Sequence, residues 1–411
     1  MTQKLHETDF NEAPGRVMHI DINSCFATIE QQTNPHLRGR PIVVAAYNSP
    51  RGCILAPSIE AKRFGIKTGM RVYEARLLYP GLEVLEPNPG KYRLVHLQFR
   101  KLLKEFTNEV VPKSIDEFVL NFKNYELVAS DLIKVAKEIK QRIKKEIGDY
   151  ITVSIGIAPN RFLAKTASNL KKPDGLWEIN SKNFLDIYSK LKLIDLSGID
   201  IRNKMRLNSI GINDVVDFYR ADLLRLRAAF KSVNSYYWYL RLRGWEIDDF
   251  ETERKSFGNS FALPYQTDLR PILQKLCVKT GARLRSGQYF ARGVHLSLSF
   301  KDHTYWHQGK TLKKNIFDSS DIYKEASKIL MTCPSEPRRS GVHILAVSVF
   351  NLTKKISSQL DLFADVLKNE QLVMATDRAN QKWGEFAVTP ARMFSTNLVK
   401  DRISFGGVRE L

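Results

Sequence analysis

The stretch that decides the fold is VMHIDI at Val17–Ile22, which is followed by a helix-like segment at Ala27–Gln31. A short apolar run of this kind is typical of a strand buried inside a sheet. PIVVAA at Pro41–Ala46 has the same character, and its β-branched residues suit burial on both faces. Two more strands are predicted at Val119–Phe122 and at Ile151–Ile157.

Helix-like segments separate these strands. Ser58–Arg63 stops at Gly65, Tyr92–Val110 carries apolar residues at helical spacing, and Ser130–Ile147 is a long charged helix candidate. Strands that alternate with helices indicate one α/β domain, which we expect to end near Trp177.

The remaining chain has a different pattern. Ser181–Trp245 is helical with short turns, and the polar stretch Phe250–Phe257 predicts a tether. Beyond it, the alternating strands Val294–Phe300 and Val342–Phe350 bracket helix-like material, which predicts a small α+β unit. The region after Lys355 is expected to be a mobile tail with one apolar cluster.

The composition excludes several classes of protein. The chain has 411 residues, of which 43% are apolar and 26% charged, so a globular protein of two to four domains is expected. No run approaches the roughly 18 apolar residues of a membrane helix, and the N-terminus lacks the apolar core of a signal peptide. The four cysteines form no CxxC pair, which argues against a zinc knuckle or a disulfide scaffold and fits a reducing cytosol.

The charge is the first positive indication of function. There are 64 Lys and Arg against 44 Asp and Glu, a net charge of +20. Such an excess favours encounter with polyanions, above all nucleic acid, although a basic protein without such a partner is the alternative.

Three acidic residues lie where predicted strands begin or end. Asp21 is near the end of the first strand, and Asp116 with Glu117 forms a turn just before another. Carboxylates that converge at strand ends suit hard cations such as Mg²⁺, and two such ions can bind both the attacking and the leaving oxygen of a phosphoryl transfer. The alternative is that these acids are strand-end caps or surface turns.

The residues around these acids resemble the motifs of the Y-family DNA polymerases, the translesion enzymes. The first two motifs are matched by DINSCFA at Asp21–Ala27, with Glu30 after it, and by SIDEF at Ser114–Phe118. The stretch that closes the family's palm is matched by three segments, Gly156–Asn160, Leu163–Ser168 and Lys172–Gly175. The resemblance spans about Val17–Phe350. Asn23 and the segment Glu60–Lys62 resemble the bacterial UmuC type more than the DinB type.

The resemblance implies a multidomain α/β fold shaped as a right hand, with a palm, small fingers, a helical helix-hairpin-helix thumb and an α+β little finger. The implied parts are an N-terminal extension (1–15), palm (16–37 and 77–177), fingers (38–76), thumb (178–245), linker (246–256), little finger (257–355) and C-terminal tail (356–411).

The resemblance also implies the catalytic and metal-binding residues. Asp21, Asp116 and Glu117 would hold two Mg²⁺ ions, with Mn²⁺ as an alternative, and the backbone carbonyl of Ile22 would be a further ligand. Glu117 would lie nearest the ion that lowers the pKa of the primer 3′-hydroxyl.

Nucleotide contacts are implied at four positions. Phe26 matches the aromatic steric gate that excludes a ribose 2′-hydroxyl, with a core aromatic as the alternative. Lys172 matches the lysine that contacts the triphosphate, although its neighbour Lys171 could serve instead. Cys53 aligns with a small fingers residue over the base pair, and Lys62 lies on the fingers helix.

The fingers depart from the commoner pattern of the family. Where many members have a Tyr and an Arg that contact the triphosphate, this chain has Ile59 and Lys62. Ile59 cannot donate a hydrogen bond, and Lys62 cannot form the two-pronged contact of Arg. Nucleotide affinity is therefore expected to be weak unless Arg63 or Lys67 compensates.

DNA contacts are expected in the thumb and the little finger. Gly198 and Gly211 resemble the turns of a helix-hairpin-helix, which binds phosphate without reading sequence, but Asp200 stands where a second glycine is usual. The segment 257–355 has 16 Lys and Arg against 6 Asp and Glu. Its candidates for phosphate contact are Arg292, Lys301, Lys310, Lys313, Lys314, Arg338 and Arg339.

QLDLF in the tail resembles the pentapeptide that binds the bacterial sliding clamp. Leu360, Leu362 and Phe363 would fill apolar pockets while Gln359 forms hydrogen bonds at the rim.

The sequence thus predicts a template-directed, low-fidelity DNA polymerase of the translesion type, acting in DNA repair, the SOS response and mutagenesis. Its partners would be primer-template DNA, a deoxynucleotide and the clamp, with a UmuD-like subunit and RecA as further candidates, and it would work in the cytoplasm at the nucleoid. One alternative is a catalytically silent scaffold subunit of a mutasome. Another is a different palm enzyme such as a nucleotide cyclase.

Overall fold

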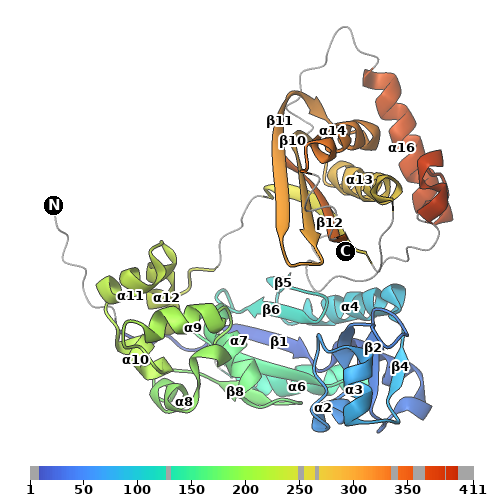
Figure 1. The fold of residues 1–411 in the computed structure, drawn as a ribbon. Coiled ribbons are helices and arrows are strands. Elements are labelled where there is room, and N and C mark those ends of the chain that lie inside the picture. Colours follow the sequence, from blue (N-terminus) through green and yellow to red (C-terminus); the bar gives the residue numbers. More distant parts are fainter. Residues whose placement is uncertain are drawn as a thin grey trace. The chain divides into compact units, whose positions relative to one another are not determined.

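The computed structural model describes residues 9–125, 131–248, 254–263, 268–334, 341–354, 366–384 and 386–396. The described residues form two compact units, one within residues 9–248 and the other within residues 254–396 (Figure 1). Both units combine helices with sheets, which confirms the predicted mixed α/β, multidomain architecture. Within the described residues, no helix has the length and apolar character needed to cross a membrane.

The first unit is built on a five-stranded sheet in the order β5-β6-β1-β7-β8. The central strand β1 (Val17–Ile22) is the VMHIDI stretch and runs antiparallel to both neighbours. The others are β5 (Val110–Pro112), β6 (Glu117–Asn121), β7 (Val153–Ala158) and β8 (Leu176–Glu178). Because β1 is buried on both faces, it fixes the register of the whole sheet.

Helices cover both faces of this sheet. The Ile20 side packs against α1 (Cys25–Thr33), α4 (Pro89–Leu103) and α6 (Leu132–Glu146), and the opposite side packs against α7 (Arg161–Leu170). These helices confirm the predicted alternation, although α4 ends at Leu103 and not near Val110 as expected. Thr107 and Asn108 already belong to the turn that leads into β5.

Two smaller parts flank the five-stranded sheet at opposite ends (Figure 1). At one end is a three-stranded sheet with two short helices, comprising β2 (Ile42–Ala45), β3 (Ile54–Pro57), β4 (Glu83–Leu85), α2 (Ile59–Arg63) and α3 (Val72–Leu78). At the other end is a helical cluster, comprising α8 (Phe184–Lys190), α9 (Ile201–Asn208), α10 (Val215–Arg220), α11 (Leu223–Phe230) and α12 (Asn234–Leu242).

The second unit is a four-stranded sheet in the order β11-β10-β12-β9, packed against α13 (Leu269–Ser286) and α14 (Ser319–Met331). Its strands are β9 (Ser256–Ala262), β10 (Tyr289–Phe300), β11 (Tyr305–Ile316) and β12 (Val342–Lys354). The two predicted strands lie within β10 and β12. The interpretation of the segment between them as helix-like was incomplete, because it contains β11 before α14.

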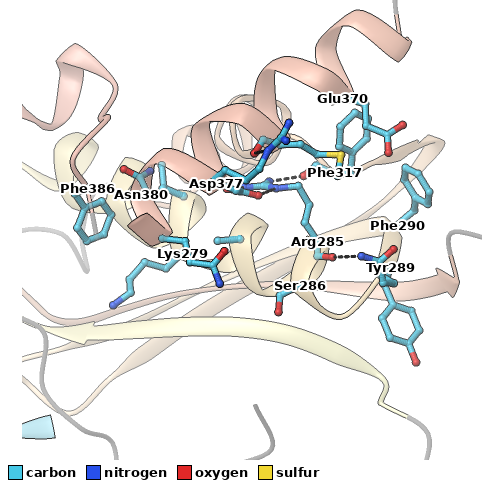
Figure 2. A pocket seen from close by; sticks show the side chains of 16 residues that line it. Lys279, Arg285, Ser286, Tyr289, Phe290, Phe317, Glu370, Asp377, Asn380 and Phe386 are labelled. Atoms are coloured by element: carbon cyan, nitrogen blue, oxygen red, sulfur yellow. Dashed lines mark hydrogen bonds and ion pairs between the residues drawn. The ribbon is translucent and has the colours of Figure 1, made fainter. Parts of the chain in front are cut away.

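The region after Lys355 is not only a tail, because it contains helix α16 (Val366–Trp383). The Arg285 guanidinium of α13 donates two hydrogen bonds, of 2.6 and 2.8 Å, to the Asp377 carboxylate of α16 (Figure 2). Beside this pair lies a cavity of about 480 Å³ whose lining includes Phe290, Phe317 and Phe386.

Candidate active site

Three acidic residues meet at one end of the five-stranded sheet. Asp21 of β1 lies directly opposite Glu117, the first residue of β6. Asp116 precedes β6, and its carbonyl accepts a hydrogen bond of 2.9 Å from the N–H of Ile22. The antiparallel pairing of two buried strands therefore brings Asp21 together with acids that lie 95 and 96 residues further along the sequence.

The charges of these acids interact. Burial raises the pKa of Asp116, and the neighbouring charges of Asp21 and Glu117 raise it further. A hydrogen bond from Ser114 lowers this pKa but does not cancel the rise. Burial would also raise the pKa of Glu117, but the nearby His19 and Lys165 outweigh burial and lower that pKa to about 2. Repulsion within such a cluster is relieved by a cation.

Two lysine ammonium groups pair with this cluster. Lys172 Nζ, in the loop after α7, lies 2.7 Å from Asp21 Oδ2. Lys165 Nζ, on α7, donates to both oxygens of Glu117 at 2.8 and 2.7 Å. From the sequence we singled out Lys172 but assigned no role to Lys165. The only local signal for Lys165 was a charged residue flanked by small and apolar residues in the middle of its helix.

The donor set is compatible with divalent cations. Within the described residues, no three His, Cys, Asp or Glu side chains are already arranged to hold a metal ion. Ammonium groups instead contact oxygens of Asp21 and Glu117. Carboxylate oxygens in a mutually repelling cluster are nevertheless the hard ligands that Mg²⁺ prefers.

Lys62 of α2 lies near the same cluster. Burial lowers the pKa of Lys62, the charge of Lys172 lowers it further, and the charge of Asp21 raises it. The part of the fold with the three-stranded sheet therefore contributes the Lys62 cation, whose charge interacts with that of Asp21. Ile59, the first residue of α2, has no polar side chain to add to it.

Phe26 lies on α1 and is 7% exposed. Its ring stacks on Tyr92 of α4, with 4.4 Å between centroids and 10° between planes. The Tyr92 hydroxyl donates a hydrogen bond of 2.8 Å to Glu30, which also accepts one from Lys91. This packing is compatible with either of the roles considered from the sequence, a steric gate or a core aromatic.

The first unit contains two cysteines, Cys25 and Cys53. Burial raises the pKa of the Cys25 thiol, and the charges of Asp116 and Asp21 raise it further. Cys53 is partly exposed and pairs with Arg71 in an isolated bridge. A protonated thiol is a poor nucleophile, so we do not expect Cys25 to react. The role of Cys53 as a small packing residue stays a prediction.

The helical cluster contains the two predicted glycine turns. Gly198 and Gly211 have φ values of +96° and +77°, which glycine adopts without strain. Asp200 caps α9 by accepting a hydrogen bond of 2.7 Å from the N–H of Asn203, and Asp214 caps α10 in the same way. A DNA phosphate would accept hydrogen bonds from N–H groups of this kind. At the helix start after each glycine turn, one such group already donates to an aspartate carboxylate.

Four of the predicted DNA-contact residues of the second unit, Arg292, Lys310, Lys313 and Lys314, lie on its sheet, and Lys301 lies in the turn after β10. Arg292 of β10 and Lys313 and Lys314 of β11 are exposed. Arg338 and Arg339 lie outside the described residues, and so does the segment Gln359–Phe363.

Comparison with known proteins identifies the family. Residues 20–169 match the impB/mucB/samB family, and residues 253–362 match the C-terminal domain of that family. DNA polymerase IV of Pelotomaculum thermopropionicum is 30% identical over 387 residues, which cover 91% of this chain and 94% of that protein. The chain belongs to the Y family of DNA polymerases. DNA polymerase IV 1 of Bacillus subtilis is likewise 30% identical, over 90% of this chain and 92% of that protein.

Solved Y-family structures share this fold. A chimera of the Dbh and Dpo4 polymerases has a TM-score of 0.73 and 26% identity, covering 82% of this chain and 99% of the chimera. DinB from Sulfolobus solfataricus has a TM-score of 0.53 at 26% identity, with the same coverage.

These matches establish a DNA-directed DNA polymerase of the translesion type, and membership of the Y family implies the use of divalent metal. The type they support is DinB, or DNA polymerase IV. The UmuC-like character of Asn23 and Glu60–Lys62 stays a prediction.

Proposed function

We propose that this Y-family chain extends a primer by two-metal-ion nucleotidyl transfer at the Asp21–Asp116–Glu117 cluster. The pairing of Asp21 with Glu117 across β1 and β6, with Asp116 beside them, is the observation that carries the proposal. The three carboxylates and the carbonyl of Ile22 would hold two Mg²⁺ ions, or Mn²⁺ in their place. When bound, the ions would lower the pKa of the primer 3′-hydroxyl and stabilise the charge on the leaving pyrophosphate.

The side chains around the cluster would bind and orient the nucleotide. Lys172 and Lys62 would contact the triphosphate, with Lys172 moving from Asp21 to a phosphate oxygen. Phe26 would limit the space beside the sugar, and Cys53 would lie over the base pair. Lys165 would keep Glu117 ionised and oriented, because it contacts both carboxylate oxygens.

The parts of the fold would take the roles of a right hand. The five-stranded sheet would be the palm, the three-stranded sheet part the fingers, the helical cluster the thumb and the second unit the little finger. The little finger would begin at Ser256, the first residue of β9, and not at Phe257 as predicted from the sequence. The other predicted boundaries would be kept, with α16 after the little finger.

The partners would be primer-template DNA, a deoxynucleotide and the bacterial sliding clamp. Gly198 and Gly211 of the thumb and Arg292, Lys313 and Lys314 of the little finger would contact DNA phosphates, together with Arg338 and Arg339. Gln359, Leu360, Leu362 and Phe363 would bind the clamp. A UmuD-like subunit and RecA would be further partners, and the work would take place at the nucleoid in the cytoplasm.

Single-nucleotide insertion on four templates tests this proposal. With one template base varied, we expect the complementary deoxynucleotide to be inserted in each case, with frequent errors and only with Mg²⁺ or Mn²⁺ present. A scaffold subunit would bind the primer-template and insert nothing. A nucleotide cyclase would consume nucleotide without DNA, which would contradict the proposal.

A further inference from the structure

Asn23 is a buried amide placed two residues after Asp21, and it is 4% exposed. Its Oδ1 accepts hydrogen bonds of 2.8 Å from the backbone N–H of Asp174 and of 3.1 Å from the Thr152 hydroxyl. Its Nδ2 donates a hydrogen bond of 2.9 Å to the Ser154 hydroxyl. One side chain at the end of β1 therefore joins β7 to the loop that carries Lys172.

That loop has little regular structure of its own. Asp174 has a φ of +56°, a left-handed conformation that costs energy in a non-glycine residue. The turn is tight, since a Cβ on Gly175 would lie 1.7 Å from the carbonyl oxygen of Lys171. Lys140 of α6 forms an ion pair of 2.9 Å with the Asp174 carboxylate. Asn23 and Lys140 thus hold the loop from two sides.

We propose that Asn23 is a positioning residue that sets where Lys172 meets Asp21 and the nucleotide phosphates. The inference rests on the proposed role of Lys172 in nucleotide binding. Without the acceptor on Asn23, the N–H of Asp174 loses its partner and the loop loses its link to β1. An amide makes this link without placing a fourth negative charge beside Asp21, Asp116 and Glu117.

The test is the dissociation constant of the deoxynucleotide, measured on a primer that ends in a dideoxynucleotide so that no chemistry follows. With dCTP opposite dG and Mg²⁺ present, Asn23→Ala should raise this constant about tenfold, because the three hydrogen bonds of the Asn23 side chain, including the one to the loop, are lost. Asn23→Asp keeps the acceptor for the Asp174 N–H but loses the donor to Ser154 and adds a fourth negative charge beside the cluster, so it should restore only part of the affinity.

A double-mutant cycle with Lys172→Met separates positioning from general stability. Lys172→Met should raise the dissociation constant, and adding Asn23→Ala should raise it no further. Asn160→Ala is the matched control. Asn160 is also buried, caps α7 and donates to the carbonyls of Arg241 and Trp245. Asn160→Ala should lower the melting temperature. Its effect on the dissociation constant should simply add to that of Lys172→Met.

Ser154→Ala removes the partner of Asn23 Nδ2 and also the 3.4 Å hydrogen bond that Ser154 accepts from the N–H of Gly175 in the loop. It should raise the dissociation constant less than Asn23→Ala, again with no further rise when combined with Lys172→Met, and it keeps the test available if Asn23→Ala does not fold. Independent effects of Asn23→Ala and Lys172→Met would overturn the inference. An unchanged constant in Asn23→Ala, with Lys172→Met weakened, would overturn the inference alone. An unchanged constant in Lys172→Met would overturn the role of Lys172 and this inference with it.

Discussion

Lys172 Nζ lies 2.7 Å from Asp21 Oδ2, so the residue proposed to bind the nucleotide pairs with a residue proposed to bind metal. Both groups are partly shielded, with 37% and 13% of their side-chain surfaces exposed. A metal ion that binds Asp21 must compete with this ammonium group. We therefore expect metal binding at Asp21 to be coupled to the release of Lys172 toward a triphosphate.

Replacing Lys172 should have opposite effects on the two ligands. In the absence of nucleotide, Lys172→Met should bind Mn²⁺ about fivefold more tightly, because the competing charge is gone. Its affinity for deoxynucleotide should fall. Electron paramagnetic resonance of free Mn²⁺ measures the first effect, with the exposed neighbour substitution Lys171→Met as control. Unchanged Mn²⁺ affinity in Lys172→Met would contradict the coupling.

Asp116→Asn should abolish incorporation and yet stabilise the metal-free protein. The folded-state pKa of Asp116 is raised, so this residue favours folding below its unfolded pKa, and that contribution is lost as the pH rises through the folded pKa. At neutral pH the neutral amide removes the repulsion, and we expect a melting temperature about 2–4 °C higher without metal. Mg²⁺ should raise the melting temperature of the wild type more than that of the variant. A lower melting temperature in Asp116→Asn would show that the repulsion is unimportant.

Phe26→Ala should allow insertion of ribonucleotides. The space left by the ring would admit a 2′-hydroxyl, at a cost of about 3–5 kcal/mol in stability because a stacked core ring is removed. Competition between ribonucleotide and deoxynucleotide in single insertions measures the effect. Tyr92→Phe keeps the stacking partner and should exclude ribonucleotides as the wild type does. If Phe26→Ala is equally selective, Phe26 is a core aromatic only.

Asp200→Gly should strengthen binding to DNA. The substitution frees N–H groups at the start of α9 for a phosphate, so the affinity for primer-template should rise and the slope of log affinity against log salt should steepen by about one. Fluorescence anisotropy at several salt concentrations gives both quantities. Asp131→Gly removes a similar cap from α6 and should leave DNA binding unchanged. A rise in neither quantity would mean that this turn does not contact phosphate.

Asp377→Ala should loosen α16 from α13. Arg285 would lose a two-pronged, charge-assisted partner, and we expect a loss of about 1.5–3 kcal/mol in the stability of the second unit (Figure 2). Limited proteolysis should then cut within α16 while nucleotide incorporation on short substrates is kept. Resistance to proteolysis equal to that of the wild type would show that other contacts hold the helix.

The strands with clear apolar patterns could be predicted from the sequence, and those without them could not. β1 is buried on both faces, and its register alone brings Asp21 and Glu117 together. β11 was missed because most of its residues are exposed and polar, which leaves no alternation to detect. The ion pair of Lys165 with Glu117 joins a helix to a strand 48 residues away, and such a contact leaves no local pattern.

Primer extension by the double variant Asp116→Asn, Glu117→Gln tests the central claim most directly. Both substitutions keep side-chain size and remove the charges proposed to hold the metal ions. The account predicts that the wild type extends a primer in Mg²⁺, while the variant binds the same primer-template with unchanged affinity and adds no nucleotide. Extension by the variant at a rate near that of the wild type would contradict the assignment of the active site.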